Sequence, residues 1–222
     1  MTTSLPLPAS LRAVGGEGRA SERLLHNRSY DVESWLEDDD HFRLIGRMQD
    51  VKVHGFTFIP DDDPITMHDM VVELVIEAPA MIISAADVQM RTHPHDECPN
   101  ILAIYQQLVG MSITRGFVPK VREMFGGPRA CTHIAAMLMA MAPVAVQSMW
   151  GFMERTGRTP PVGSPGREAG LERNRDTCHV WATDGPLFTR IDRGEPVGMP
   201  RTMQDRLRSK GIDPDTFQPL QG

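Results

Sequence analysis

Alternation of apolar and polar positions marks the middle of the chain. Every second residue between Met67 and Glu77 is apolar on one face: Met70, Val72, Leu74 and Ile76. This period of two is typical of a half-buried β-strand. Met81–Met90 alternates again after the turn at 78–80, so we expect an antiparallel hairpin over residues 67–90. An earlier run, residues 42–53, predicts a further strand, although neither of its faces is purely apolar.

In the second half of the chain, apolar positions recur three or four residues apart. The longest stripe, within Thr132 to about Trp150, consists of Ile134, Met137, Leu138, Met141 and Ala145. It predicts a long amphipathic helix, with Thr132 as its N-cap and a kink or split at Pro143. Shorter helices are expected over Ile101–Val109 and Val118–Phe125. Strands followed by helices favour an α+β domain, with the helices on one face of a small antiparallel sheet.

Composition divides the chain into four parts. Residues 1–22 are rich in Ser, Pro, Gly and Arg without periodicity, which predicts a flexible N-terminal arm. Residues 23–155 contain the predicted strands and helices and form the α+β core domain. The Pro/Gly-rich residues 156–170 are expected to be a linker. We expect the C-terminal segment, residues 171–222, to pack on the core.

Charge and apolar content indicate which kinds of binding partner the sequence favours. The net charge is −6, from 23 Lys and Arg against 29 Asp and Glu, without a dense basic cluster, which disfavours a nucleic-acid surface. No run approaches the ~18 apolar residues of a membrane span, and the N-terminal residues lack the apolar core of a secretory signal. We therefore expect a cytoplasmic protein that binds a small-molecule substrate. An exposed edge of the sheet could pair in a homodimer.

Candidate metal ligands lie where the hydrophobic pattern changes from one element to the next. His68 and Asp69 open a strand, Cys98 precedes a helix, and Cys131 and His133 open the longest helix. Such positions can converge in space, and a helix N-terminus stabilises a thiolate. Zinc and iron prefer thiolate and imidazole, with carboxylate as a harder supplement. The sequence therefore predicts a mononuclear Zn or Fe site on Asp69, Cys98, Cys131 and His68.

Other residues near these ligands have candidate catalytic roles. His68 or His133 could act as a general base, because an imidazole titrates near neutral pH. Arg129 and Arg91 lie beside the candidate ligands in sequence, so either could bind a substrate carboxylate or be an ordinary surface arginine.

A substrate pocket is expected to draw on two further groups. His95 lies in the loop before Cys98, and a polar and aromatic patch near the C-terminus contains Cys178, His179 and Trp181. The alternative is structural: this patch packs the C-terminal segment onto the core, and His95 is exposed. The absence of a Cys-x-x-Cys pair also leaves open that the cysteines are small buried residues.

Short motifs are spread from residue 26 to about residue 181. They are Asn27-Arg28-Ser29-Tyr30, His68-Asp69-Met70, Cys98-Pro99, Leu108-Val109-Gly110, Gly116-Phe117, Gly126-Gly127, Cys131-Thr132-His133 and Asp176-Thr177-Cys178-His179. Together they resemble the bacterial family called domain of unknown function 2889 (DUF2889). The resemblance favours a metal or thiolate centre at these motifs, while the family name carries no established activity.

A more distant resemblance concerns the order of the candidate ligands. His68-Asp69-Met70, Cys98, Gly110 and Cys131-Thr132-His133-Ile134 follow one another at spacings similar to those of U-type (SufU/IscU-like) iron–sulfur scaffold proteins. This resemblance implies a SufE/NifU-like arrangement and places Asp69, Cys98 and Cys131 at three ligand positions. His68 stands where those proteins have a cysteine, and Glu97 replaces a glycine. A cluster needs mostly thiolate ligands, so this set favours a mononuclear site.

The favoured hypothesis is a metal-dependent enzyme that acts on a small aromatic or acyl organic acid by hydrolytic or lyase chemistry. The metal would polarise a carbonyl or lower the pKa of a bound water. One alternative is an iron–sulfur or sulfur-carrier scaffold without turnover. The other is a metal-free structural protein in which the cysteines and histidines are simply buried.

Overall fold

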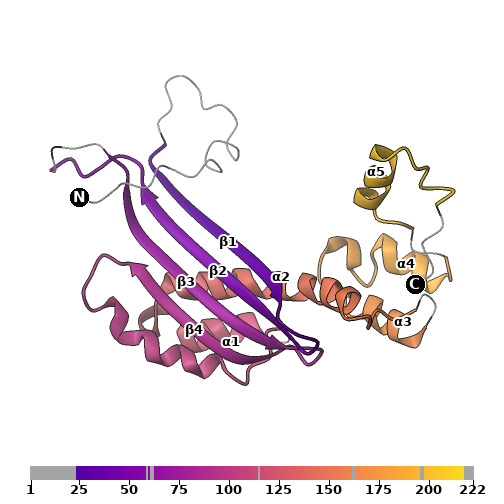
Figure 1. Ribbon diagram of the computed structural model, residues 1–222, viewed down its shortest axis with the longest axis horizontal. Helices are drawn as coiled ribbons and strands as arrows, with labels where there is room; N and C mark the ends of the chain where they lie inside the picture. Colours follow the sequence, from indigo (N-terminus) through magenta and orange to yellow (C-terminus); the bar gives the residue numbers. More distant parts are fainter. Residues whose placement is uncertain are drawn as a thin grey trace. The chain divides into compact units, whose positions relative to one another are not determined.

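A four-stranded antiparallel sheet in the order β1-β2-β3-β4 forms the framework of the first part of the chain (Figure 1). Its strands are β1 (His26–Leu36), β2 (His41–Lys52), β3 (Ile65–Glu77) and β4 (Ile82–Thr92). The computed structural model describes residues 24–58, 60, 63–114, 116–161, 164–195 and 198–217. The predicted arm, residues 1–22, lies outside them.

Alternation along the strands separates a buried face from a solvated one. In β2, Phe42, Leu44 and Met48 are buried, whereas the intervening Arg43 and Arg47 are partly exposed. Because successive side chains of a strand point to opposite faces, one face of the sheet belongs to the core. The other face carries ion pairs between neighbouring strands, such as Arg43 with Glu73.

Helices cover the apolar face of this sheet (Figure 1). After β4 come the 3₁₀ helix η2 (Cys98–Leu108), α1 (Phe117–Phe125), the short 3₁₀ helix η3 (Gly127–Arg129) and α2 (Thr132–Arg155). Helix α2 packs against β1, β2 and β3, and η2 packs against β4. Ile134, Met137, Leu138, Met141 and Ala145 of α2 are fully buried in the same core cluster as the strands. The predicted α+β class, with helices on one face of a small antiparallel sheet, is confirmed.

The structure departs from the sequence-based expectations at three places. Strand β1 was not predicted, because nearly all its side chains are exposed and its apolar residues do not alternate. Helix α2 continues past Pro143 without splitting, and its N-cap residue is Cys131 rather than Thr132. The helix expected over Ile101–Val109 is of the 3₁₀ type and begins earlier, at Cys98.

Helix α2 is also, among the described residues, the one helix long and apolar enough to cross a membrane. Its buried side chains belong to the core cluster that the sheet completes. The core helix of a soluble protein has the same length and composition, so this property by itself does not indicate a membrane span.

The chain divides into two compact units, residues 1–159 and residues 160–222. The second contains α3 (Pro165–Glu172), the 3₁₀ helix η4 (His179–Trp181), α4 (Pro186–Asp192) and α5 (Arg201–Ser209). Phe188 is buried within the second unit. The Arg175 guanidinium lies 3.6 Å from the centre of the Phe188 ring, and Trp181 contacts this ring edge-on. Since α3 begins at Pro165, residues 165–170 of the expected linker belong to this helix.

Candidate functional site

The candidate site is centred on a buried carboxylate near the end of β2. Asp50 is paired in register with Arg28 on β1 and with His68 on β3. Directly opposed residues of an antiparallel sheet point to the same face, so these three side chains meet on the side that α2 covers. The first turn of α2 adds His133. Four elements distant in sequence thus converge on Asp50.

Basic groups surround this carboxylate. Its side chain is 3% exposed. Arg28 donates from Nε to Oδ1 at 2.6 Å and from Nη2 to Oδ2 at 2.5 Å. His26 Nε2 lies 3.0 Å from the same Oδ1. The bidentate pairing of Arg28 with Asp50 fixes the orientation of the carboxylate, because a guanidinium and a carboxylate are complementary planar groups.

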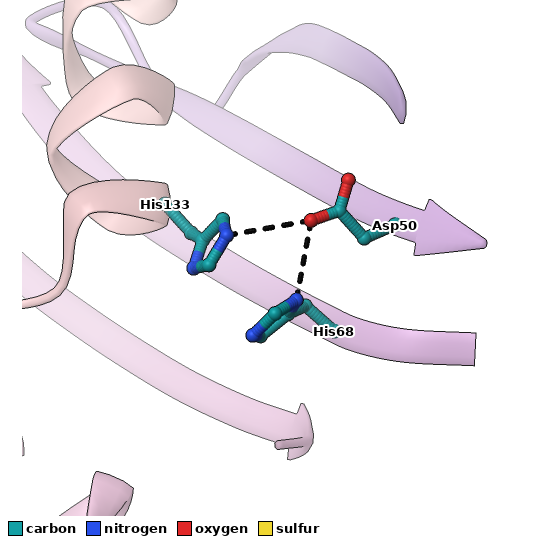
Figure 2. A group of neighbouring side chains, drawn as sticks. All are labelled: Asp50, His68 and His133. Carbon is teal, nitrogen blue, oxygen red and sulfur yellow. Dashed lines mark hydrogen bonds and ion pairs between the residues drawn. The ribbon is translucent and has the colours of Figure 1, made fainter. Parts of the chain in front are cut away.

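Two histidines face Oδ2 of Asp50, the oxygen that also accepts from Arg28 Nη2 (Figure 2). His68 Nδ1 is 3.1 Å and His133 Nε2 is 3.3 Å from Asp50 Oδ2. The two imidazole rings are 3.8 Å apart at their centres and inclined by 34°. Candidate ligand atoms of Asp50, His68 and His133 all lie within 4.8 Å of one another, so this group could hold a metal ion.

A thiol extends the cluster along the start of α2. Cys131 Sγ lies 3.6 Å from His133 Nδ1, on the ring edge that does not face Asp50. The backbone N–H of Cys131 donates to the hydroxyl of Tyr105 at 3.1 Å. Tyr105 is 1% exposed and belongs to η2, so a buried phenol holds the residue that precedes α2. Burial raises the pKa of Tyr105 well above its ordinary value, which keeps this hydroxyl neutral.

The histidines and thiols share one cavity of about 660 Å³. Its polar lining includes His68, His133, Cys98 and Cys131, and its apolar wall is formed by Met70, Met90, Pro94, Ile101 and Ala130. A largely apolar cavity with a few convergent polar groups is the usual form of a small-molecule site.

The charges at the site favour neutral imidazoles. Burial lowers the pKa of His68 and of His133, and for His133 the nearby His68 and Arg28 lower it further. Burial alone would raise the pKa of Asp50, but hydrogen bonds from Arg28 and His26 outweigh this effect and lower it. At neutral pH, Asp50 is therefore an anion that Arg28 neutralises, and both facing rings keep a free lone pair.

Five of the predicted residues line this cavity: His68, His95, Cys98, Cys131 and His133. Asp69, predicted as a ligand, lies elsewhere. It accepts two hydrogen bonds from Arg47, at 3.0 and 2.6 Å. Because neighbouring side chains alternate along β3, Asp69 points to the face of the sheet opposite His68.

The remaining predicted residues are not part of the cavity lining. Arg129 donates to the backbone carbonyl of Arg122. Cys178 and His179 are exposed in the second unit, and Trp181 of that unit packs against Phe188. The substrate-binding roles expected for these residues stay predictions.

Sequence reasoning missed the residues that orient the histidines, namely Asp50, Arg28 and His26. Asp50 lies within the predicted strand 42–53, which has no clean apolar face, and β1 was not recognised as a strand, so nothing in the pattern paired them. Arg28 does stand in one of the short motifs, Asn27-Arg28-Ser29-Tyr30, and this was the available signal.

More than half of the chain matches a known protein family. The model of the family described as "Protein of unknown function (DUF2889)" matches residues 26–147. The chain belongs to this family. The DUF2889 region includes all four strands and Asp50 with the residues around it, which are His26, Arg28, His68, Cys131 and His133. No curated protein and no solved structure matches the chain, so the further resemblance to U-type scaffold proteins is not borne out and the SufE/NifU-like arrangement is not confirmed.

Proposed function

We propose that this DUF2889 protein is a metal-dependent enzyme that acts on a small aromatic or acyl organic acid by hydrolytic or lyase chemistry. The observation that carries the proposal is the shared cavity. Two imidazoles and two thiols, from His68, His133, Cys98 and Cys131, line it beside an apolar wall. This donor set suits mononuclear zinc or iron, which take nitrogen and sulfur ligands.

The residues present have complementary roles in such a site. The imidazoles of His68 and His133, whose candidate ligand atoms lie within 4.8 Å of each other, would hold the metal, and the thiols of Cys131 and Cys98 line the same space. A bound metal supplies polarisation of a carbonyl or a water of lowered pKa, which serves both acyl hydrolysis and cleavage of a bond beside a carbonyl. The apolar wall, which includes Met70 and Met90, suits the aromatic or acyl part of the substrate.

A scaffold for an iron–sulfur cluster is less well supported. Clusters are held mostly by thiolates, whereas half of this donor set is imidazole. Asp69, one of the three implied ligand positions, is bound to Arg47 on the other face of the sheet. A mononuclear site agrees better with these contacts.

One contact favours a second candidate, a metal-free thiol hydrolase. Cys131, His133 and Asp50 follow one another at 3.6 and 3.3 Å, in the order nucleophile, base and orienting carboxylate. In this candidate, Cys131 would attack an acyl carbonyl, and His133 would accept the thiol proton and pass it to the leaving group. Water activated by His133 would then hydrolyse the resulting thioester, release the acid and restore the thiol.

Elemental analysis separates these candidates. The protein is purified without a metal-binding tag, and we expect about one zinc or iron per chain, as for a mononuclear site. His68→Ala and His133→Ala should lose the metal. Asp69→Asn and Cys178→Ala serve as matched controls, because they change a predicted ligand on the other face and an exposed thiol in the second unit, and both should retain it.

Activity on aryl and acyl esters and acids is then measured before and after chelation. Loss on chelation and recovery with Zn²⁺ or Fe²⁺ support the metal enzyme. Activity that survives chelation but is abolished by iodoacetamide and by Cys131→Ala identifies the thiol hydrolase instead. A folded protein that takes up neither metal under anaerobic conditions contradicts the metal-dependent proposal.

A further inference from the structure

The two edges of the sheet differ in how the described residues cover them. At β4, the backbone of Ile83 donates to Met111 and accepts from Gly110. At β1, the outermost strand on the other side (Figure 1), no hydrogen bond from a described residue reaches the edge that faces away from β2. Within the described part of the chain, β1 therefore presents a row of unpaired backbone N–H and C=O groups.

Strand β1 also lacks the features that usually keep an edge strand from pairing. It is 11 residues long and follows β2 without a bulge over its whole length. Its sequence, HNRSYDVESWL, contains neither proline nor lysine. Natural edge strands are commonly short, bulged or protected by these residues, so β1 is open to the addition of a further strand.

Large apolar side chains are exposed along the same segment. Of the eleven that are exposed among the described residues, five lie in or just before β1, between 41% and 77% exposed: Leu24, Leu25, Tyr30, Trp35 and Leu36. Their positions are symmetric about Tyr30, because the other four lie five or six residues before it or after it. An antiparallel pair of two identical strands centred on Tyr30 therefore matches apolar positions with one another.

We infer that two copies of this chain pair through β1, antiparallel and with Tyr30 opposite Tyr30 of the partner subunit on a two-fold axis, so that their two sheets become one. In this register, Leu24 lies opposite Leu36 of the partner subunit, and Leu25 lies opposite Trp35 of the partner subunit. The two-fold axis repeats each pair. Opposed residues of an antiparallel pair point to the same face, so each pair joins two apolar side chains. The inference does not depend on the proposed function.

The charged residues of β1 favour this register over its neighbours. Asp31 lies opposite Ser29 of the partner subunit, and Glu33 lies opposite Asn27 of the partner subunit, so no like charges meet. The next register in one direction places Asp31 opposite its own copy, and the one after that places it opposite Glu33. Like charges directly opposite each other destabilise a strand pair. The next register in the other direction places Leu25 opposite Glu33 and loses the apolar match.

A hollow beside Leu36 provides room for a side chain of the second copy. It has a volume of about 260 Å³, lies between β1 and the C-terminal part of α2, and is lined by Leu36 with the buried rings of Phe42 and Phe152. Leu36 is paired with Phe42 and so points to the face that α2 covers. Leu24 of the partner subunit, opposite Leu36 on this face, would enter the hollow and bury apolar surface there.

Sedimentation of the whole chain in the presence of a chelator tests the association, because removal of metal excludes a metal-bridged dimer. We expect a dimer. A wild type that sediments as a monomer at every concentration overturns the inference, and neither result bears on the metal-dependent proposal.

A matched set of variants tests the surface. Tyr30→Asp places two carboxylates opposite each other on the axis, so we expect the dissociation constant of the dimer to rise on the order of 100-fold. Val109→Asp introduces the same charge at an exposed apolar residue outside β1 and should leave the dimer unchanged, as should Tyr30→Phe. Equal dissociation constants for Tyr30→Asp and Val109→Asp overturn the inference.

Disulfide formation tests the register. Opposed Cα atoms of an antiparallel pair are about 4.5–5.5 Å apart, within reach of a disulfide, whereas diagonal neighbours are too distant. In a Cys178→Ala background, which removes an exposed thiol, air oxidation should link Tyr30→Cys into a covalent dimer but not Asp31→Cys or the parent protein. Failure of Tyr30→Cys to link, or linkage of Asp31→Cys in its place, overturns the register. This test also decides the matter if Tyr30→Asp does not fold.

Discussion

Arg28 holds Asp50 through both carboxylate oxygens, and this pair joins the edge strand β1 to the candidate site. Strand β1 is otherwise almost entirely exposed, so it has little apolar surface with which to stay on the sheet. The Asp50 side chain is only 3% exposed. The Arg28–Asp50 ion pair therefore ties β1 to a buried part of the sheet.

Replacement of Arg28 should destabilise the protein more than replacement of a similar arginine on the other face. We expect Arg28→Ala to lower the free energy of unfolding by about 2–4 kcal/mol, because it leaves a buried carboxylate without its main partner. Arg47→Ala is the matched control: Arg47 binds Asp69 in the same geometry and is equally exposed, at 41% against 39%, but the side chain of Asp69 is 10% exposed. Urea denaturation of both variants measures the difference. Equal losses would show that burial of Asp50 has no special weight.

Stability should fall as the pH decreases. The pKa of Asp50 is lowered in the folded protein, so its contribution is complete above its unfolded pKa of about 3.9 and is lost below it. The pKa values of His68 and His133 are also lowered. For a base, this means that the unfolded chain binds protons more readily, so stability begins to fall below about pH 6.5.

Urea denaturation of the metal-free protein between pH 3 and pH 8 checks this prediction. The loss between pH 6.5 and pH 5 should shrink in the His68→Gln, His133→Gln double variant. A wild type whose unfolding free energy is constant from pH 4 to pH 7 contradicts the assigned directions of the histidine pKa shifts.

The hydroxyl of Tyr105 is expected to stabilise the start of α2. Its oxygen accepts the backbone N–H of Cys131, the N-cap residue, which has no capping hydrogen bond from its own side chain. Tyr105→Phe leaves this N–H without its acceptor, so we expect a loss of about 1–2 kcal/mol. Tyr30→Phe, at an exposed tyrosine of β1, is the control and should change stability by less. If Tyr105→Phe leaves the free energy of unfolding unchanged, a water molecule has replaced the phenol as the acceptor.

The sequence could predict those elements in which apolar periodicity reflects burial. Strand β3 and helix α2 have one apolar side that packs into a single core, and both were found with nearly correct bounds. Strand β1 could not be found in this way, because nearly all its side chains are exposed and Val32 alone of them packs against the core cluster, while backbone pairing with β2 and the Arg28 ion pair hold the strand. Patterns of burial carry no signal for such a strand.

The candidate site was predictable to the same partial extent. Residues at the starts of elements did converge, and His68, Cys98, Cys131 and His133 line one cavity. Asp69 does not join them, because neighbouring side chains of one strand point to opposite faces, and Asp69 pairs with Arg47 on the face opposite His68. Asp50 became visible only through the register that pairs it with His68, and register depends on the assembled sheet rather than on one strand.

Two methionine side chains of α2 pack closely against Gly46 of β2. A Cβ at this position would lie 2.7 Å from the sulfur of Met137 and 2.8 Å from that of Met141, so we expect Gly46→Ala to cost about 1–3 kcal/mol by overpacking. Gly151, on the exposed side of α2, has no atom within 4 Å of such a Cβ, and Gly151→Ala should instead add about 0.5–1 kcal/mol. Thermal and urea denaturation measure both changes.

Since α2 carries His133, Gly46→Ala should also weaken Zn²⁺ binding, whereas Gly151→Ala should leave it unchanged. Undiminished stability and Zn²⁺ affinity in Gly46→Ala would show that the two methionines move aside. The position of α2, and with it the geometry around Asp50, would then not depend on the close approach at Gly46.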